Sequence, residues 1–225
     1  MSFPLDISLL FGAALLVTLI WFYFSSNSKS ALLLILAWAG IQSVLALTGI
    51  FTDVKALPPK LVMLGVFPAF VIILIVLLSK RGKAFISQLN LKTLTWFHSI
   101  RVIVEIVLAL LYHQGLVPVE MTFEGRNFDI LSGLSAGLIA FLAFRGSVVN
   151  SKLLIGWNLI CLALLLNIII TAALAAPSPF QQLAFNQPNV AVLYFPFSLL
   201  PTVVVPLVLF AHFAALYKLF SRVDY

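Results

Sequence analysis

Apolar runs, each about as long as one membrane crossing, follow one another along almost the whole chain. Hydrophobic residues make up 63% of the 225-residue sequence, and only 9% of its residues are charged. A soluble domain carries roughly 45–50% apolar and about 25% charged residues, so this chain has too little polar surface to face water. A helix needs about 20 apolar residues to cross the hydrocarbon core. The sequence therefore predicts a polytopic, all-α membrane protein.

Seven of these runs are predicted to be membrane-spanning helices within a single transmembrane domain, residues 1–225. The runs are approximately 7–24, 30–51, 61–79, 95–113, 128–146, 152–175 and 197–218. They are too long and too continuous for barrel strands, in which apolar and polar residues alternate. A helix also satisfies its backbone hydrogen bonds within the segment. Seven crossings would put the two chain ends on opposite sides of the bilayer.

Basic residues favour one orientation of these helices. Nine lie at ends and loops on one side, namely Lys29, Lys80, Arg81, Lys83, Lys92, Arg145, Lys152, Lys218 and Arg222. Three lie on the opposite side, namely Lys55, Lys60 and Arg126. Because cytoplasmic loops carry an excess of Lys and Arg, the N-terminus is predicted outside and the C-terminus inside, in a bacterial inner membrane. The net charge of +6 is assigned to these loops, and nucleic acid is not an expected partner. The basic segment 81–93 is predicted as a loop or as a short amphipathic helix on the inner surface.

Two parts of the sequence repeat at a constant offset. Asp6-Ile7 opens the first run and Asn27-Ser28-Lys29 follows it, while Asp129-Ile130 and Asn150-Ser151-Lys152 do the same 123 residues later. This pattern predicts a parallel repeat of three, one and three helices. Its parts are unit 1 at about 1–80, a linking helix at about 95–113 and unit 2 at about 126–220. Chance matches are the alternative, because most residues are Leu, Ala, Ile or Val.

Prolines recur in the third run of each unit. Pro68 lies twelve residues before Lys80, and Pro206 lies twelve residues before Lys218, which is an offset of 138. Proline removes a backbone donor and frees the carbonyl one turn earlier. Interrupted helices in matching halves of a transporter point to its binding site. Pro68, Pro206 and the additional Pro201 are therefore candidate hinges, with static kinks as the alternative.

The run at 95–113 carries a polar stripe on an otherwise apolar helix. At about 100° per residue, His98, Arg101, Glu105 and Tyr112 fall within about 60° of arc, and Glu105 lies close to the bilayer midplane. A charge at this depth must face protein or water. One interpretation is a structural ion pair between Arg101 and Glu105, which are four residues apart. The other is a ligand, ion or proton site in which Glu105 is the titratable group.

Further candidate residues lie on other runs. Trp38, Trp157 and Asn158 are predicted either to line a central binding site or to pack between helices. His98 and His212 lie in the inner halves of their runs and are expected to approach each other across the bundle. Two imidazoles can hold a haem iron or another metal ion. No paired-histidine spacing occurs within one helix, so no cofactor is predicted and haem binding is an alternative.

The predicted architecture resembles two known groups of membrane proteins. Seven helices, an outer N-terminus and a parallel repeat resemble the SWEET and PQ-loop transporters and the microbial rhodopsins. A rhodopsin needs a lysine in the middle of its last helix, whereas Lys218 lies at the inner end. The PQ-loop signature is Pro-Gln within a helix, whereas Gln187-Pro188 has the reverse order in a loop. The stretches Met121-Thr-Phe-Glu-Gly-Arg-Asn-Phe-Asp129 and Leu200-Pro-Thr-Val-Val-Val-Pro206 look like uncharacterised seven-span bacterial proteins, which implies no activity.

These patterns predict a protein that binds or transports a small solute at a polar site near the midplane. Glu105 and Arg101 form the expected centre of that site, and no nucleophile–base pair indicates an enzyme. A non-transporting scaffold or sensor is the alternative, with the polar stripe used for helix docking. A haem-binding redox protein that uses His98 and His212 is the second alternative. The lipid bilayer is the expected partner, and a homo-oligomer is compatible with the sequence.

Overall fold

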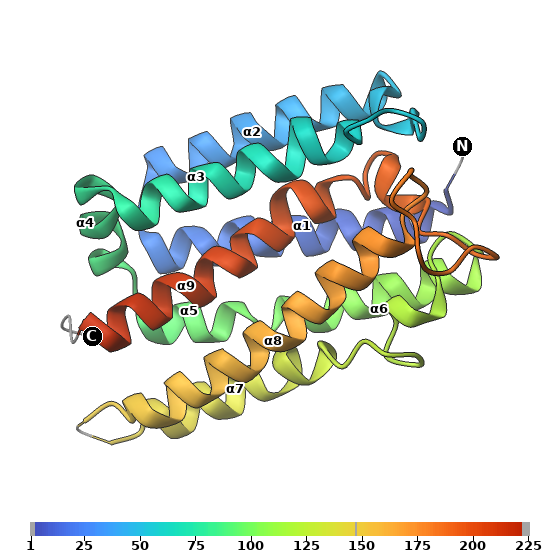
Figure 1. Cartoon of the computed structure of the whole chain (residues 1–225). Coiled ribbons are helices and arrows are strands. Elements are labelled where there is room, and N and C mark those ends of the chain that lie inside the picture. Colours follow the sequence, from blue (N-terminus) through green and yellow to red (C-terminus); the bar gives the residue numbers. More distant parts are fainter. Residues whose placement is uncertain (1–2, 147, 222–225) are drawn as a thin grey trace.

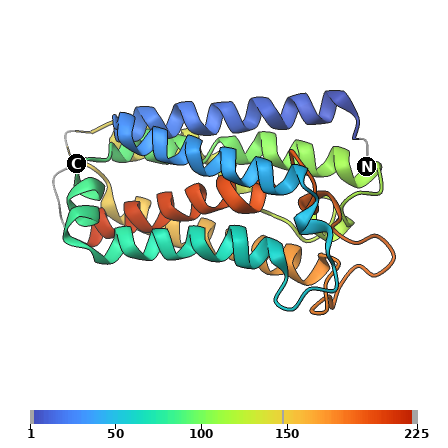
Figure 2. The same cartoon turned by 90° about the horizontal axis from the view of Figure 1, so that it is seen from above.

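The computed structural model describes residues 3–146 and 148–221, and every regular element in that part of the chain is a helix or helical turn (Figure 1). The long helices lie side by side along one axis. The two chain ends lie at opposite ends of this bundle in both views (Figures 1 and 2). The predicted all-α fold is therefore confirmed. The predicted inner residue Arg222 lies outside the described residues.

Within residues 3–146 and 148–221, eight helices run along the bundle axis. They are α1 (Leu5–Ser26), α2 (Lys29–Leu47), α3 (Phe67–Leu78), α5 (Leu91–Phe97), α6 (Ile100–His113), α7 (Ile130–Phe144), α8 (Ser151–Ala175) and α9 (Val205–Ser221). Short 3₁₀ turns occur at η1 (Ile50–Thr52), η3 (Val119–Met121) and η4 (Ala191–Leu193), and π-helical turns occur at η2 (Val62–Val66) and η5 (Leu200–Val204). Each of the apolar runs is thus helical over most of its length.

Five helical segments of the described chain are long and apolar enough to cross a membrane. They are Leu5–Ser26, Lys29–Leu47, Leu91–His113, Ser151–Ala175 and Leu200–Ser221. Their outward faces carry large apolar side chains, such as Leu34 with 71% of its surface exposed and Ile160 with 64%. Monomeric soluble proteins rarely expose continuous apolar surface of this kind. The length of these helices and their exposed apolar surface are those of membrane-spanning helices.

A basic helix crosses one end of the bundle. The segment that is predicted as a loop or an amphipathic helix forms α4 (Lys80–Gln88), which is bent by 85° from the segment Val62–Leu78. The buried Lys218 Nζ on α9 donates hydrogen bonds to the carbonyls of Ser87 (2.8 Å) and Leu89 (2.7 Å). A lysine in this position satisfies carbonyls that a helix end leaves unpaired. Lys218 therefore fastens α4 to the end of α9.

The helices α3 and α9 begin in the same unusual way. Each follows a π-helical turn, and the turns at Val62–Val66 and Leu200–Val204 are 138 residues apart, the same offset as Pro68 and Pro206. The two turns pack against each other, because a Cβ added to Gly65 would lie 2.4 Å from Thr202 Cγ2. The helices α5 and α6 also pack against both α1 and α7. The division into two repeat units remains a prediction.

The helix α2 supplies donors to both interrupted helices. Pro68 and Pro206 have no N–H for the carbonyls of Leu64 and Thr202, four residues earlier. Gln42 Nε2 donates to the Leu64 carbonyl at 2.9 Å. Trp38 Nε1, one turn earlier on α2, donates to the Thr202 carbonyl at 2.8 Å. Trp38, predicted as a ligand-binding or packing residue, thus has its indole N–H engaged in a contact between helices.

Candidate functional site

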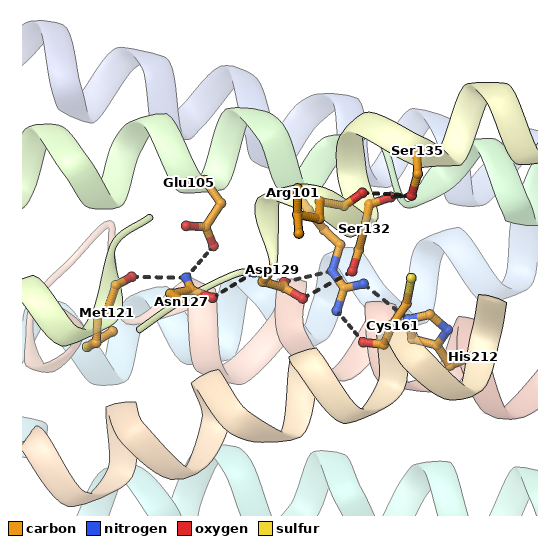
Figure 3. A network of polar contacts seen from close by, with 10 residues as sticks. Arg101, Glu105, Met121, Asn127, Asp129, Ser132, Ser135, Cys161 and His212 are labelled. Atoms are coloured by element: carbon orange, nitrogen blue, oxygen red, sulfur yellow. Dashed lines mark hydrogen bonds and ion pairs between the residues drawn. The ribbon is translucent and has the colours of Figure 1, made fainter. Parts of the chain in front are cut away.

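Arg101 on α6 is the centre of a buried polar network (Figure 3). Its Nε forms an ion pair with Asp129 Oδ2 at 2.8 Å, and the two side chains are only 3% and 6% exposed. Its Nη1 lies 3.2 Å from His212 Nε2 on α9, and its Nη2 donates to the Cys161 carbonyl of α8 at 3.4 Å. Each of the three nitrogens therefore has a partner, and each partner belongs to a different element.

This arrangement corrects the predicted ion pair between Arg101 and Glu105. Residues four apart face the same side of a helix, but the Arg101 guanidinium pairs with Asp129 at the start of α7. Ser132 Oγ also lies 3.5 Å from Asp129 Oδ1. The charge of Arg101 is therefore balanced without Glu105.

Glu105 lies one turn further along α6 and has a different partner. Its Oε1 accepts a hydrogen bond from Asn127 Nδ2 at 2.6 Å, and Asn127 Nδ2 also donates to the Met121 carbonyl at 3.0 Å. Glu105 is 2% exposed. Its second oxygen, Oε2, is buried and has no hydrogen-bond partner. Buried side-chain oxygens usually have a partner, so this atom is an open acceptor.

The connection between α6 and α7 brings Asn127 and Asp129 to this depth. Met121, Thr122 and Asn127 are all buried along it, and Asn127 Oδ1 accepts a hydrogen bond from the Asp129 backbone N–H at 3.0 Å. The connection thus folds into the bundle. Our interpretation of the sequence missed Asn127 and Asp129 as site residues, although Asp129 opens the fifth apolar run and is one of few acidic residues in the chain.

Close packing holds α7 against the charged residues of α6. A Cβ added to Gly133 would lie 2.9 Å from the Val102 backbone nitrogen and 3.3 Å from Arg101 Cβ. Only a glycine permits this approach without a shift of the backbone. Gly133 therefore sets the distance between the two helices at the level of the ion pair.

The two inner histidines meet, as the sequence predicts. The rings of His98 and His212 stack with centroids 4.0 Å apart, and His212 Nδ1 lies 2.9 Å from Asn158 Oδ1. Because arginine can only donate, His212 Nε2 accepts from Arg101 and Nδ1 donates to Asn158. Both nitrogens are occupied, so His212 does not fit the role of a haem or metal ligand that the alternative reading assigned to it.

The remaining predicted residues separate into two groups. Trp157 contacts the edge of His98 at a centroid distance of 5.4 Å and donates from Nε1 to Ser135 Oγ at 2.9 Å, so it belongs to the histidine side of the network. Tyr112 lies near the end of α6, with its ring against His113. Its backbone carbonyl accepts a hydrogen bond from Gln187 Nε2 at 2.9 Å. Tyr112 is therefore outside the network.

A cavity of about 480 Å³ lies beside the network, between α3, α6, α8 and α9. Its walls are mainly apolar and include Val66, Phe70, Ile73, Val104, Leu108, Leu165, Ile169, Ala172, Val204, Val208 and Leu209. Arg101, Glu105 and Asp129 also line it. Pro201 and Pro206 belong to its wall, whereas Pro68 is not a lining residue. Asp53 and Lys60, from the connection that follows α2, line it too and form a 2.7 Å ion pair.

The fold and this site define an all-helical bundle with membrane-length apolar helices, a mainly apolar cavity and buried charges on one wall of that cavity. Residues 58–220 match the model of a family described as a domain of unknown function (DUF8737). The match covers well over half of the chain, so the protein belongs to this family. The whole Arg101 network lies within the matched residues, and Trp38 and Gln42 precede them. No curated protein and no solved structure matches the chain.

Proposed function

We propose that this protein is a seven-span protein of a bacterial inner membrane that binds a small solute in the cavity and carries it across the bilayer. One observation carries the proposal. The cavity of about 480 Å³ is lined by Glu105, whose buried Oε2 has no partner within the protein. Binding sites for small molecules are mainly apolar clefts of roughly 300–1,000 Å³ with a few well-placed polar groups. Intramembrane ionisable residues mark functional sites by default.

Seven crossings are supported by the course of the chain. The chain ends lie at opposite ends of the bundle, which requires an odd number of crossings. Besides the five long helical segments, the bent segment Val62–Leu78 and the helix Ile130–Phe144 would each cross once. The latter has only 15 residues, or about 22 Å of helix. The buried connection that precedes it would complete the crossing, since irregular backbone is tolerated at this depth when protein surrounds it.

Movement across the bilayer would come from the two interrupted helices. The turns η2 and η5 both line the cavity through Val62, Leu200 and their neighbours, and they contact each other directly. π-Helical turns are rare and occur frequently at functional sites. We propose that the two units rock about α5 and α6, with the helix breaks before Pro68 and Pro206 absorbing the change. Glu105 would couple the movement to the solute.

A scaffold or sensor is the second candidate, because Arg101 has fixed protein partners on all three nitrogens. Such a saturated ion-pair network holds helices in one arrangement. In this case Arg101 and Asp129 are structural, and the cavity has no transported ligand. Both candidates assign Arg101 a structural role, and they differ in the role of the cavity.

The experiment compares wild type with two substitutions on α8. Ala172 lines the cavity, so Ala172→Phe places a ring inside it. Ala163 is exposed on the same helix and does not line the cavity, so Ala163→Phe is the matched control. Small molecules extracted from the three purified proteins are compared by mass spectrometry. A molecule that accompanies wild type and Ala163→Phe should be depleted from Ala172→Phe.

The same molecule then serves as the substrate in proteoliposomes. Uptake by wild type and by Ala163→Phe, together with loss of uptake in Ala172→Phe, is the expected result. An extract that is the same for all three proteins would contradict binding in the cavity. Binding without uptake would reject transport and support the sensor.

A further inference from the structure

We infer that the cavity takes an amphipathic amine, with an apolar body against α3, α8 and α9 and an ammonium group that donates a hydrogen bond to Glu105 Oε2. This inference rests on the proposed binding function and adds the chemical class of the ligand. It follows from three features of the cavity, namely its balance of charge, its open acceptor and its apolar walls.

The charged groups at the cavity wall do not balance. Arg101 and Asp129 neutralise each other at 2.8 Å, and Asp53 and Lys60 do so at 2.7 Å. Glu105 is the remaining ionisable residue among those that line the cavity. Its carboxylate receives a hydrogen bond from the neutral Asn127 amide and therefore no compensating charge. A cationic ligand would supply the missing charge at a depth where an unpaired charge is unfavourable.

The open acceptor calls for a donor on the ligand. Glu105 Oε2 is buried without a hydrogen-bond partner, and the three nitrogens of Arg101 are directed to Asp129, His212 and Cys161. An ammonium group has N–H donors as well as a positive charge, and charge-assisted hydrogen bonds are stronger than neutral ones. A carboxylate ligand would gain no counter-charge from Glu105, and all three Arg101 nitrogens already face protein groups. The site therefore selects against anions.

The walls determine the rest of the ligand. The side chains around Glu105 on α6 are Val104 and Leu108, and the facing walls carry Leu165, Val204 and Val208. These walls offer apolar contact and little hydrogen bonding, so a polyhydroxylated solute such as a sugar would lose its hydration without replacement. A compact hydrocarbon body is compatible with both the volume and the chemistry of the cavity.

Three probes with one apolar cage and different head groups test the inference. They are 1-aminoadamantane, 1-adamantanol and adamantane-1-carboxylate. Affinities are measured by titration calorimetry on protein in lipid nanodiscs, with empty nanodiscs as the reference for partitioning into lipid. The amine should bind most tightly and the carboxylate least. Glu105→Gln should weaken binding of the amine by about ten- to a hundredfold, the magnitude of a hydrogen bond to a charged group, because the amide has no negative charge, and should affect the alcohol less.

Two further variants separate the ligand class from the cavity itself. Glu124→Gln, which neutralises an exposed carboxylate paired with His113, should leave the amine affinity unchanged. Ala172→Phe should abolish binding of the amine. If the carboxylate or the alcohol binds at least as tightly as the amine to wild type, or if Glu105→Gln binds the amine normally, the ligand class is wrong. In that case, if Ala172→Phe no longer binds the probe that wild type binds, the result would still support a binding cavity.

The ranking of the three probes on wild type needs no variant, so the inference remains testable even if Glu105→Gln does not fold. Absence of saturable amine binding to wild type overturns it. The test of the proposed function does not depend on this result, because the extraction experiment makes no assumption about the class of the bound molecule.

Discussion

At the scale of single residues, the buried ion pair and the open carboxylate of α6 have different roles. Arg101 and Asp129 hold α6 against α7, and His212 and Cys161 extend the contact to α9 and α8. Glu105 lies one turn away with one oxygen unpaired. A pair of this kind contributes little net stability, but removal of one partner leaves an uncompensated buried charge. Stability measurements can therefore separate the two roles.

We predict that Arg101→Met destabilises the protein by about 3–5 kcal/mol, because Asp129 is left buried without its counter-charge. The double variant Arg101→Met with Asp129→Asn should recover most of this loss. The free energy of unfolding in mixed micelles checks both. A double variant as unstable as the single one would mean that the guanidinium is required for its other contacts.

The exposed ion pair between Asp53 and Lys60 should respond to pH. The hydrogen bond and the charge of Lys60 lower the pKa of Asp53 below its ordinary value of 3.8. A lowered carboxyl pKa means that the pair stabilises the fold above pH 3.8 and that this contribution is lost as the pH falls through the lowered pKa. Lys60→Met should return the pKa of Asp53 toward 3.8 in a carboxyl ¹³C NMR titration. Lys55→Met, which removes a neighbouring amine, should leave it unchanged.

At the scale of secondary-structure elements, α2 donates hydrogen bonds to the π-helical turns that precede α3 and α9. Gln42 and Trp38 donate to the carbonyls of Leu64 and Thr202, for which Pro68 and Pro206 lack the N–H of an α-helical hydrogen bond. Both contacts involve a carbonyl in the π-helical turn that precedes the proline. These two hydrogen bonds therefore stabilise the helix breaks that a rocking movement would use.

A double-mutant cycle tests the contact between Gln42 and the helix break at Pro68. Gln42→Leu should destabilise the protein by about 1–3 kcal/mol, the magnitude for leaving a buried acceptor unsatisfied. In a Pro68→Ala background the restored N–H serves the Leu64 carbonyl, so the same substitution should have a smaller effect. Unfolding free energies of the four proteins give the coupling. Equal effects in both backgrounds would show that Pro68 and Gln42 act independently.

The approach of α7 to α6 provides a second test at this scale. Gly133→Ala forces a Cβ to within 2.9 Å of the Val102 nitrogen, and overpacking of this kind costs about 1–3 kcal/mol. Gly156→Ala, on α8, meets nothing within 4 Å and should be stabilising by roughly 0.5–1 kcal/mol, since alanine is the better helix former. Thermal unfolding of the two variants measures the difference. A Gly133→Ala protein as stable as wild type would mean that α7 can shift away from α6.

At the scale of the whole molecule, the length of an apolar run was the most informative signal in the sequence. It predicted the helices because a long apolar segment has few other stable states in a bilayer. It did not predict the break between α5 and α6 at residues 98–99 or the burial of the connection that carries Asn127. Asp129 pairs with Arg101 because that connection folds back into the bundle. The spacing of residues along a single helix does not predict such a contact. The meeting of His98 and His212 was predictable because their depths in the bundle match.

The orientation of the bundle is the last prediction. The excess of basic residues near α4 and the other predicted inner ends predicts that these ends lie in the cytoplasm. Lys83 on α4, Lys55 after α2 and Glu124 before α7 are all exposed, so each can carry a single cysteine in a Cys161→Ala background. A membrane-impermeant maleimide should label Lys55→Cys and Glu124→Cys in intact cells, and Lys83→Cys only after permeabilisation. Labelling of Lys83→Cys in intact cells would reverse the topology, and labelling of positions 55 and 124 on different sides would contradict seven crossings.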